Sequence, residues 1–201
     1  MNLSPQILSA ALRPLDDPPG APGWNRGLLA SMDIALDERP AAVLLALHGD
    51  DDQCELLFTR RADGLAHHAG QISFPGGRID PGDRDAVDAA LREAHEEIAL
   101  PASSVTPLGY LDCLETISGF CITPVVARVH GNPPLRAEPA EVAEVFSAPL
   151  SYVLDPRNLV DRPYPTASGE RLLPEVHYAG HRIWGATAMI LANLRRRLTT
   201  T

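Results

Sequence analysis

The chain has 201 residues, a hydrophobic share of 45% and a formal net charge of −9, which fits one globular domain with extensions. No apolar run reaches about 18 residues, which argues against a membrane-spanning helix, and the polar N-terminus does not resemble a secretion signal, so we expect a cytoplasmic protein. All 17 basic residues are Arg. An acidic chain is a poor binder of nucleic acid or of an anionic membrane through its overall field, so neither partner is expected.

The chain divides into three predicted segments. Residues 1–39 are expected to form a peripheral N-terminal arm, in which a short helix over 5–13 is followed by a linker rich in Pro and Gly. The main domain is expected over 40–198, and a short tail over 199–201.

In the first half of the main domain, apolar runs bounded by Gly, Asp and Pro predict strands. These strands are expected at Ala41–Leu47, Glu55–Arg60 and Gln71–Phe74. The clearest helix is expected over Arg84–Ile98, because its apolar residues recur at steps of three and four. Asp83 or Asp85 is placed to cap the start of this helix.

The second half of the main domain combines short strands, loops and helices. Pro124 suggests that its strand is an edge strand or carries a bulge, and prolines and glycines predict a mostly irregular segment over 154–174. The predicted strands are Leu108–Leu111, Ile122–Val129, Val176–Tyr178 and Arg182–Trp184, and the predicted helices are Ala140–Phe146 and Ala186–Leu198. Because strands and helices interleave, we expect a mixed α/β sandwich.

The three cysteines give little functional information. Cys54, Cys113 and Cys121 have no metal-type spacing, and an odd number cannot form a complete set of disulfides. We expect three reduced and mostly buried thiols.

The chemistry is concentrated in three carboxylates on the predicted helix. Glu93, Glu96 and Glu97 stand at positions i, i+3 and i+4, where side chains are neighbours and like charges repel. A solvated acidic stripe is one explanation. The other is a divalent cation, since Mg²⁺ binds a few carboxylates and shares its remaining positions with water and phosphate. The neighbouring Arg92 can orient a carboxylate, and Gly76-Gly77 permits close approach of the backbone to a ligand, which favours the cation.

The stretch from Gly76 to Leu100 resembles the Nudix box, whose pattern is G-x5-E-x7-R-E-U-x-E-E-x-G-U with U apolar. Gly77 matches the first glycine, and the core R-E-x-x-E-E is complete over Arg92–Glu97. Asp83 replaces the first glutamate, eight residues rather than seven separate it from Arg92, and Ala99 replaces the late glycine. If that last position needs a positive φ, Ala costs about 1 kcal/mol relative to Gly.

A second resemblance concerns the substrate. The segment Leu56–Gly77, LLFTRRADGLAHHAGQISFPGG, is similar to the signature of the Nudix subfamily that hydrolyses coenzyme A (CoA). The Arg expected just after Leu65 is Ala66 in this chain. If that Arg contacts a phosphate of CoA, affinity or selectivity should be weaker here. The segments Thr116–Val126 and Ile183–Ala188 are also similar to this subfamily.

These resemblances imply an α/β/α sandwich with a mixed β-sheet and a reaction in which water attacks a nucleoside diphosphate. For CoA the products would be adenosine 3′,5′-bisphosphate and 4′-phosphopantetheine, with Mg²⁺ or Mn²⁺ as the cofactor. The implied metal ligands are Glu93, Glu96 and Glu97. The implied catalytic residues are Glu93, Arg92, Glu96, Glu97 and Glu141. The implied substrate contacts are Arg60, Gly70, Phe74, Gly76, Gly77, Arg78 and Ser118.

Several alternatives stay open at this point. The general base is Glu96, Glu141 or Glu144. The substrate is CoA or one of its derivatives, or else ADP-ribose, a dinucleotide or a nucleoside triphosphate. A Nudix fold can also serve as a non-catalytic ligand sensor. Dimers occur in the resembled family, so a homodimer is a candidate state, although no residue of this sequence specifies one.

Overall fold

The structure is a computed structural model, and it describes residues 5–30, 39–50, 53–166 and 169–200. Its centre is an eight-stranded sheet with the order β3-β2-β1-β7-β5, to which β4, β6 and β8 add by pairing with β1, β7 and β2. The pair β1–β7 is parallel and the others are antiparallel, so the sheet is mixed, as predicted. Its strands are β1 Arg39–His48, β2 Glu55–Arg61, β3 Ile72–Ser73, β4 Gly76–Arg78, β5 Val105–Tyr110, β6 Leu114–Glu115, β7 Phe120–Val129 and β8 Val142–Pro149.

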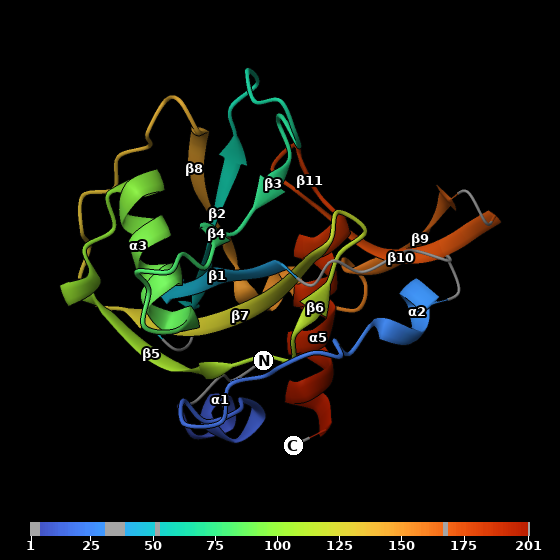
Figure 1. Ribbon diagram of the computed structural model, residues 1–201, viewed down its shortest axis with the longest axis horizontal. Helices are drawn as coiled ribbons and strands as arrows, with labels where there is room; N and C mark the ends of the chain where they lie inside the picture. Colours follow the sequence, from blue (N-terminus) through green and yellow to red (C-terminus); the bar gives the residue numbers. More distant parts are fainter. Residues whose placement is uncertain (1–4, 31–38, 51–52, 167–168, 201) are drawn as a thin grey trace.

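Helices cover both faces of this sheet (Figure 1), which gives the expected α/β/α sandwich. Alternation along β1 explains the two cores, because successive side chains of a strand point to opposite faces. Leu45 and Leu47 pack on the side of α5, whereas Ala42, Leu44 and Ala46 pack on the side of α3. The helices are α1 Pro5–Ala11, α2 Arg26–Ala30, α3 Ala86–Ile98, α4 Leu150–Val153 and α5 Gly185–Thr200, with a 3-10 helix at Ala102–Ser104. None of the described helices is long and apolar enough to cross a membrane.

A second, three-stranded sheet corrects the prediction of an irregular segment over 154–174. It has the order β11-β10-β9 and consists of β9 Val160–Thr166, β10 Gly169–Tyr178 and β11 His181–Ile183. The prolines that suggested a loop, Pro163 and Pro165, lie on the edge strand β9, where a missing N–H is tolerated. The strands predicted at Val176–Tyr178 and Arg182–Trp184 are found within β10 and at β11, and they pair with each other, with Val176 opposite Ile183.

Two further predictions of local structure are wrong. Residues 140–146 do not form a helix, because Val142–Pro149 pairs with β2 as strand β8, with Phe146 opposite Phe58. Pro124 is not on an edge strand, since β7 lies between β1 and β5. It lies where the antiparallel partner of β7 changes from β5 to β6, so the sheet accommodates a residue without an N–H there.

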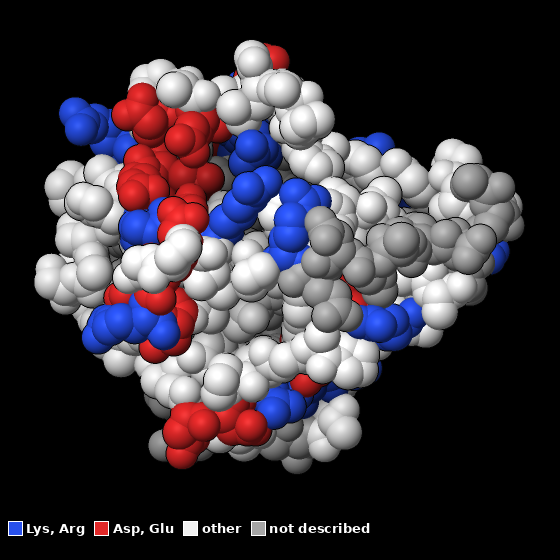
Figure 2. Space-filling view, viewed as in Figure 1, with Lys and Arg blue, Asp and Glu red and all other residues white. Residues whose placement is uncertain are grey.

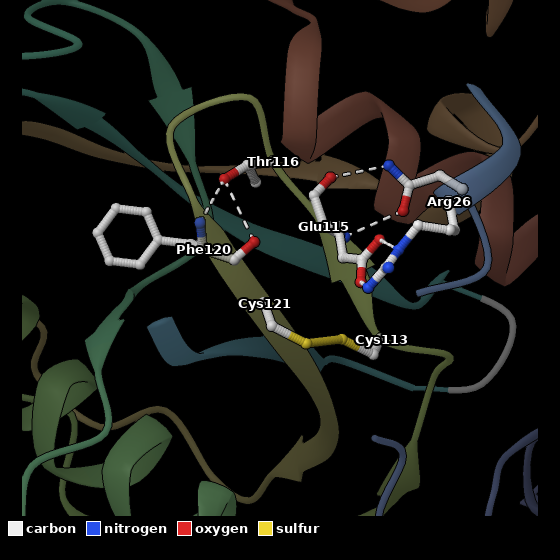
Figure 3. The surroundings of a disulfide bond; sticks show 7 residues. Arg26, Cys113, Glu115, Thr116, Phe120 and Cys121 are labelled. Carbon is white, nitrogen blue, oxygen red and sulfur yellow. Dashed lines mark hydrogen bonds and ion pairs between the residues drawn. A yellow bond between two sulfur atoms is a disulfide. The ribbon is translucent and has the colours of Figure 1, made fainter. Parts of the chain in front are cut away.

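The described part of the N-terminal arm, residues 5–30, is not peripheral. Leu8 and Leu12 are buried in the larger core cluster together with side chains of α5, and the backbone groups of Arg13 and Tyr110 exchange two hydrogen bonds of 2.9 Å. Asn25 bonds both backbone groups of the buried Glu115. Figure 3 shows Arg26 paired with the Glu115 carboxylate. The predicted tail also differs, since Thr199 and Thr200 belong to α5.

The prediction of three reduced cysteines is wrong for two of them. Cys113 and Cys121 form a disulfide (Figure 3). They are eight residues apart, and the antiparallel pairing of β6 with β7 brings them together, with Glu115 opposite Cys121. Cys54 is a buried thiol, as predicted.

Candidate active site

Helix α3 carries the three carboxylates, and its ends explain its position. Asp85 caps the start of the helix by accepting a hydrogen bond from the Asp88 N–H at 2.9 Å. The helix ends at Ala99, which has φ 56° and ψ 28°, so the position does require the left-handed conformation that the family pattern gives to Gly. Small buried side chains face the sheet, including Ala90 and Ala94. They allow α3 to pack close to β1 and β4.

Glu93 and Glu97 both meet the glycine turn that contains β4. The Gly76 N–H donates to Glu97 Oε2 at 3.3 Å, which is the only hydrogen bond of that carboxylate among the described residues. A Cβ atom at Gly77 would overlap the carboxylate of Glu93. Gly76 has φ 154°, and a Cβ there would overlap the backbone of β1. Both glycines are therefore required by close packing, and the carboxylates lie side by side against the turn.

Burial perturbs both of these acids. The side chain of Glu97 is 3% exposed, and desolvation raises its pKa to about 8, with Glu93 adding repulsion and Arg61 opposing it. Desolvation also raises the pKa of Glu93, and the neighbouring Arg92 opposes this shift. Two like charges kept together in a poorly solvated position are unfavourable unless a cation joins them.

Arg92 organises the carboxylates around it. Its guanidinium donates to both oxygens of Asp83 at 2.9 and 3.0 Å, and to Glu93 and Glu96 at 3.0 Å each. It also donates to the Arg78 carbonyl at 3.0 Å. The hydrogen bonds from Arg92 hold the pKa of Asp83 below its usual value. The replacement of Glu by Asp and the extra residue before Arg92 therefore leave a complete bidentate pair.

The donor set suits a divalent cation at Glu93 and Glu97. Carboxylate oxygens are the ligands that Mg²⁺ and Mn²⁺ prefer, and a cation between these two acids would offset their repulsion. Glu96 is different, because its side chain is 54% exposed and bonded to Arg92. Among the described residues, no three His, Cys, Asp or Glu side chains surround a common metal position. The structure thus brings together two of the three predicted ligands and sets the third beside them.

Sequence reasoning missed Arg61 as a functional residue. It ends β2, its charge acts on Glu97, and its Nε is buried without a hydrogen-bond partner. A buried guanidinium N–H without a partner is costly unless a ligand fills the position. The signal was the second Arg of the LLFTRR segment, which the family signature gives to a small polar residue.

Two of the predicted substrate contacts differ from expectation. Arg60 is bonded to Asp63 at 2.7 Å and lies 3.8 Å from Glu144, so carboxylates already engage its guanidinium. Phe74 is 2% exposed and stacks on Phe58 with ring centroids 5.1 Å apart. Its assignment as a substrate contact is wrong, because the ring is part of the core. Gly70, with φ 69°, lies against Asp63 and Arg60.

Arg78 and Ser118 lie on the exposed rim beside the glycine turn. The Arg78 guanidinium is 5.7 Å from the ring centre of Phe120. Ser118 is at the tip of the turn between β6 and β7, where its hydroxyl lies 3.0 Å from that of Thr116 and its carbonyl accepts a hydrogen bond from Arg39. The side chain of Ser118 is thus engaged in the turn itself.

The candidates for the general base have different surroundings. Glu141 is exposed in the turn immediately before β8, and its charge contributes to the raised pKa of both Glu93 and Glu97. Glu144 is held between Arg60 and His181, at 3.8 and 3.5 Å. Glu141 has no ion pair in the part of the chain that the structure describes, so no described cation engages its carboxylate.

Around α3, acidic and basic side chains occupy separate neighbouring patches of the surface. Figure 2 shows the acidic side chains gathered over α3 and a band of Arg side chains directly beside them. An anionic ligand that carries its own divalent cation would match both parts of this surface.

Comparison with known proteins agrees with this description. Residues 38–166 match the family model of the NUDIX domain. An uncharacterized Nudix hydrolase NudL of Yersinia pestis (strain Pestoides F) is 39% identical over 161 residues, which are 80% of this chain and 80% of that protein. The protein of the same name from Yersinia pseudotuberculosis serotype O:1b (strain IP 31758) has the same identity and coverage. The chain belongs to the NUDIX domain family, and its relatives are Nudix hydrolases.

Solved structures show the same fold. A Nudix hydrolase from M. smegmatis, RenU, superposes with a TM-score of 0.55 at 23% identity, covering 81% of this chain and 87% of RenU. DR0079 from Deinococcus radiodurans superposes with a TM-score of 0.52 at 13% identity, covering 80% of this chain and 85% of that one. At these identities the likeness establishes the architecture and leaves the substrate to other evidence.

Proposed function

We propose that this chain hydrolyses the diphosphate of CoA or a CoA derivative, using Mg²⁺ or Mn²⁺. One observation carries the hydrolase part: the buried Glu97 carboxylate and the part-buried Glu93 carboxylate both lie against the Gly76-Gly77 turn. The CoA part rests on the similarity of Leu56–Gly77 to the CoA-hydrolysing signature. The names of the uncharacterized relatives give no substrate.

The residues of this site have different roles in the proposed reaction. Glu93 and Glu97 would hold the cation, which when bound lowers the pKa of a coordinated water and neutralises phosphate charge. Arg92 fixes Glu93 and Glu96 by hydrogen bonds of 3.0 Å. Arg61 offers its buried, unpartnered N–H to a phosphate oxygen.

The proton of the attacking water needs an acceptor, and we assign this role of general base to Glu141. Its carboxylate is exposed and its charge acts on Glu93 and Glu97, whereas Glu96 and Glu144 are engaged by arginines. A positioned base contributes about 10²- to 10⁴-fold to a rate. We therefore expect Glu141→Gln to lower kcat by at least about 10²-fold and Glu144→Gln to have a much smaller effect. Similar losses in the two variants would contradict this assignment.

The substrate is tested by product analysis. CoA, acyl-CoA, NADH and ADP-ribose are incubated with the protein and Mg²⁺ or Mn²⁺, with and without chelator. Adenosine 3′,5′-bisphosphate and 4′-phosphopantetheine should appear from CoA only when the metal is present. If ADP-ribose or NADH is hydrolysed faster than CoA, that compound and not CoA is the preferred substrate. Absence of both hydrolysis and thermal stabilisation by the metal would favour a ligand sensor. The homodimer stays a prediction. Light scattering after gel filtration measures the molar mass of the protein in solution and so tests it.

A further inference from the structure

Strand β8 has one residue more than its partner β2, at the end where β2 reaches Arg61. The register is regular along most of the pair, up to Glu144, which is opposite Arg60. The next residue of β2, Arg61, is opposite Val142, so Ala143 has no partner on β2. One extra residue in an antiparallel pair is a β-bulge, which bends its strand and increases the local twist.

The bulge changes the face of the sheet on which the end of β8 packs. Successive side chains of a strand alternate between faces, and Phe146 and Ala148 pack in the core on the side of α5. With strict alternation, Val142 would lie on that same side. It is instead buried in the core on the side of α3, opposite Arg61, whose charge acts on Glu97. The extra residue therefore turns the end of β8 toward the helix that carries the carboxylates.

The turn before β8 is held by backbone hydrogen bonds on two sides. The Glu138 N–H donates to the Glu97 carbonyl on α3 at 2.8 Å. Ala62 directly follows β2, and its N–H donates to the Glu141 carbonyl, also at 2.8 Å. The Glu141 N–H donates to the Glu138 carbonyl at 2.9 Å. Figure 1 shows the segment before β8 passing along α3. Glu141 thus lies in a short turn held between α3 and the end of β2.

We propose that the bulge at Ala143 positions Glu141 for the reaction. This inference rests on the proposed function, in which Glu141 accepts the proton of the attacking water. Ala143 acts through the extra length of backbone that it adds, since its own side chain is exposed. Bulges beside active sites re-aim neighbouring side chains, and a displacement of about 1 Å at a catalytic group can cost about 10²-fold in rate.

Two variants of one position test this inference. Deletion of Ala143 makes the pairing of β2 with β8 regular and retains every existing pair, whereas Ala143→Ser keeps the extra residue. The deletion should lower kcat about 10²-fold and leave KM nearly unchanged, because Arg61 keeps its partner Val142. Ala143→Ser should lower kcat by less than about threefold. Combined with Glu141→Gln, the deletion should add little further loss, since both changes act on the same group.

Amide hydrogen exchange tests the position of the turn without relying on hydrolysis. The hydrogen-bonded amides of Glu138 and Ala62 should be protected in the native protein. Without the bend, the turn cannot keep both of these hydrogen bonds. At least one of the two amides should therefore exchange about tenfold faster in the deletion variant, while the amides of α3 keep their native rates. If the deletion variant does not fold, insertion of a second Ala after Ala143 extends the exposed bulge, and the same changes are expected.

A native kcat in the folded deletion variant would overturn the inference. So would losses from the deletion and from Glu141→Gln that multiply, because they would act on different groups. Native protection of both amides in the deletion variant would also overturn it. The proposed function fails separately, if the native protein hydrolyses none of the tested diphosphates, and the exchange rates alone then decide whether the bulge positions the turn. If Glu141→Gln keeps its native kcat for CoA, the base assignment and this inference fail while the hydrolase function stands.

Discussion

The buried Glu97 carboxylate should make the metal-free protein lose stability as the pH rises. Its folded-state pKa is about 8 and its ordinary value is 4.5, so the folded protein binds this proton more tightly than the unfolded chain does. The stabilisation is therefore fully present below pH 4.5 and is lost as the pH rises through about 8. At about 1.36 kcal/mol per pKa unit, the full change has an upper bound of about 5 kcal/mol.

The substitution Glu97→Gln isolates this contribution, because the amide keeps the shape of the side chain and cannot ionise. Urea unfolding of both proteins is measured with chelator between pH 5 and 9, and free energies are compared at each pH. The native protein should be progressively less stable than the variant as the pH rises, by a few kcal/mol at pH 9. Glu96→Gln is the matched control on the same helix, since Glu96 is exposed, and its difference from the native protein should stay nearly constant.

Adding Mg²⁺ at pH 8 should make the native protein more stable than Glu97→Gln, which is the reverse of the order expected without metal. A ligand that binds only the folded state stabilises it by mass action, so the native protein should gain stability and Glu97→Gln should gain much less. A difference between native protein and Glu97→Gln that does not change with pH would refute the argument that desolvation dominates this carboxylate. Equal stabilisation of the two proteins by Mg²⁺ would refute its role as a ligand.

Four other substitutions test separate parts of the structure. Ala99→Gly should raise the free energy of unfolding by about 1 kcal/mol, because Ala99 has a positive φ; urea unfolding measures this, and no gain would contradict it. Asp83→Asn should weaken the bidentate bond to Arg92 and lower kcat several-fold while thermal unfolding stays cooperative; an unchanged kcat would remove the positioning role. Asn25→Ala should cost about 2 kcal/mol, because it removes two buried hydrogen bonds; a cost near zero in urea unfolding would show that the arm is held by other contacts. Ala66→Arg should lower the KM for CoA, and an unchanged KM would exclude this exposed position as a substrate contact.

The parts of the fold with strong periodicity were predictable. The continuous apolar run of β1 indicates a strand buried on both faces, and the steps of three and four along α3 indicate one buried helix face; both elements lie where expected. The conditional argument about Ala99 also holds, since its φ is 56°. In these cases the sequence signal and the local structure depend on the same few consecutive residues.

The predictions that failed depend on contacts between distant segments. The apolar spacing of 140–146 suits a helix as well as a strand, and only pairing with β2 selects the strand. The Cys113–Cys121 bond depends on the hairpin of β6 and β7. Arg61 is recognisable as a site residue only from the structure, which shows that its charge acts on Glu97 and that its Nε is buried without a hydrogen-bond partner.

Arg92 shows how the site tolerates a departure from the family pattern. The expected glutamate is one carbon longer than Asp83, and this chain has one residue more between that position and Arg92. The shorter side chain still forms both hydrogen bonds to the guanidinium, because the loop that begins at Arg78 brings the Asp83 carboxylate to it. Arg92 also bonds the Arg78 carbonyl. One guanidinium therefore fixes both the backbone at Arg78 and the orientation of Glu93, so a change at Asp83 should affect the position of the glycine turn and of the proposed metal ligand together.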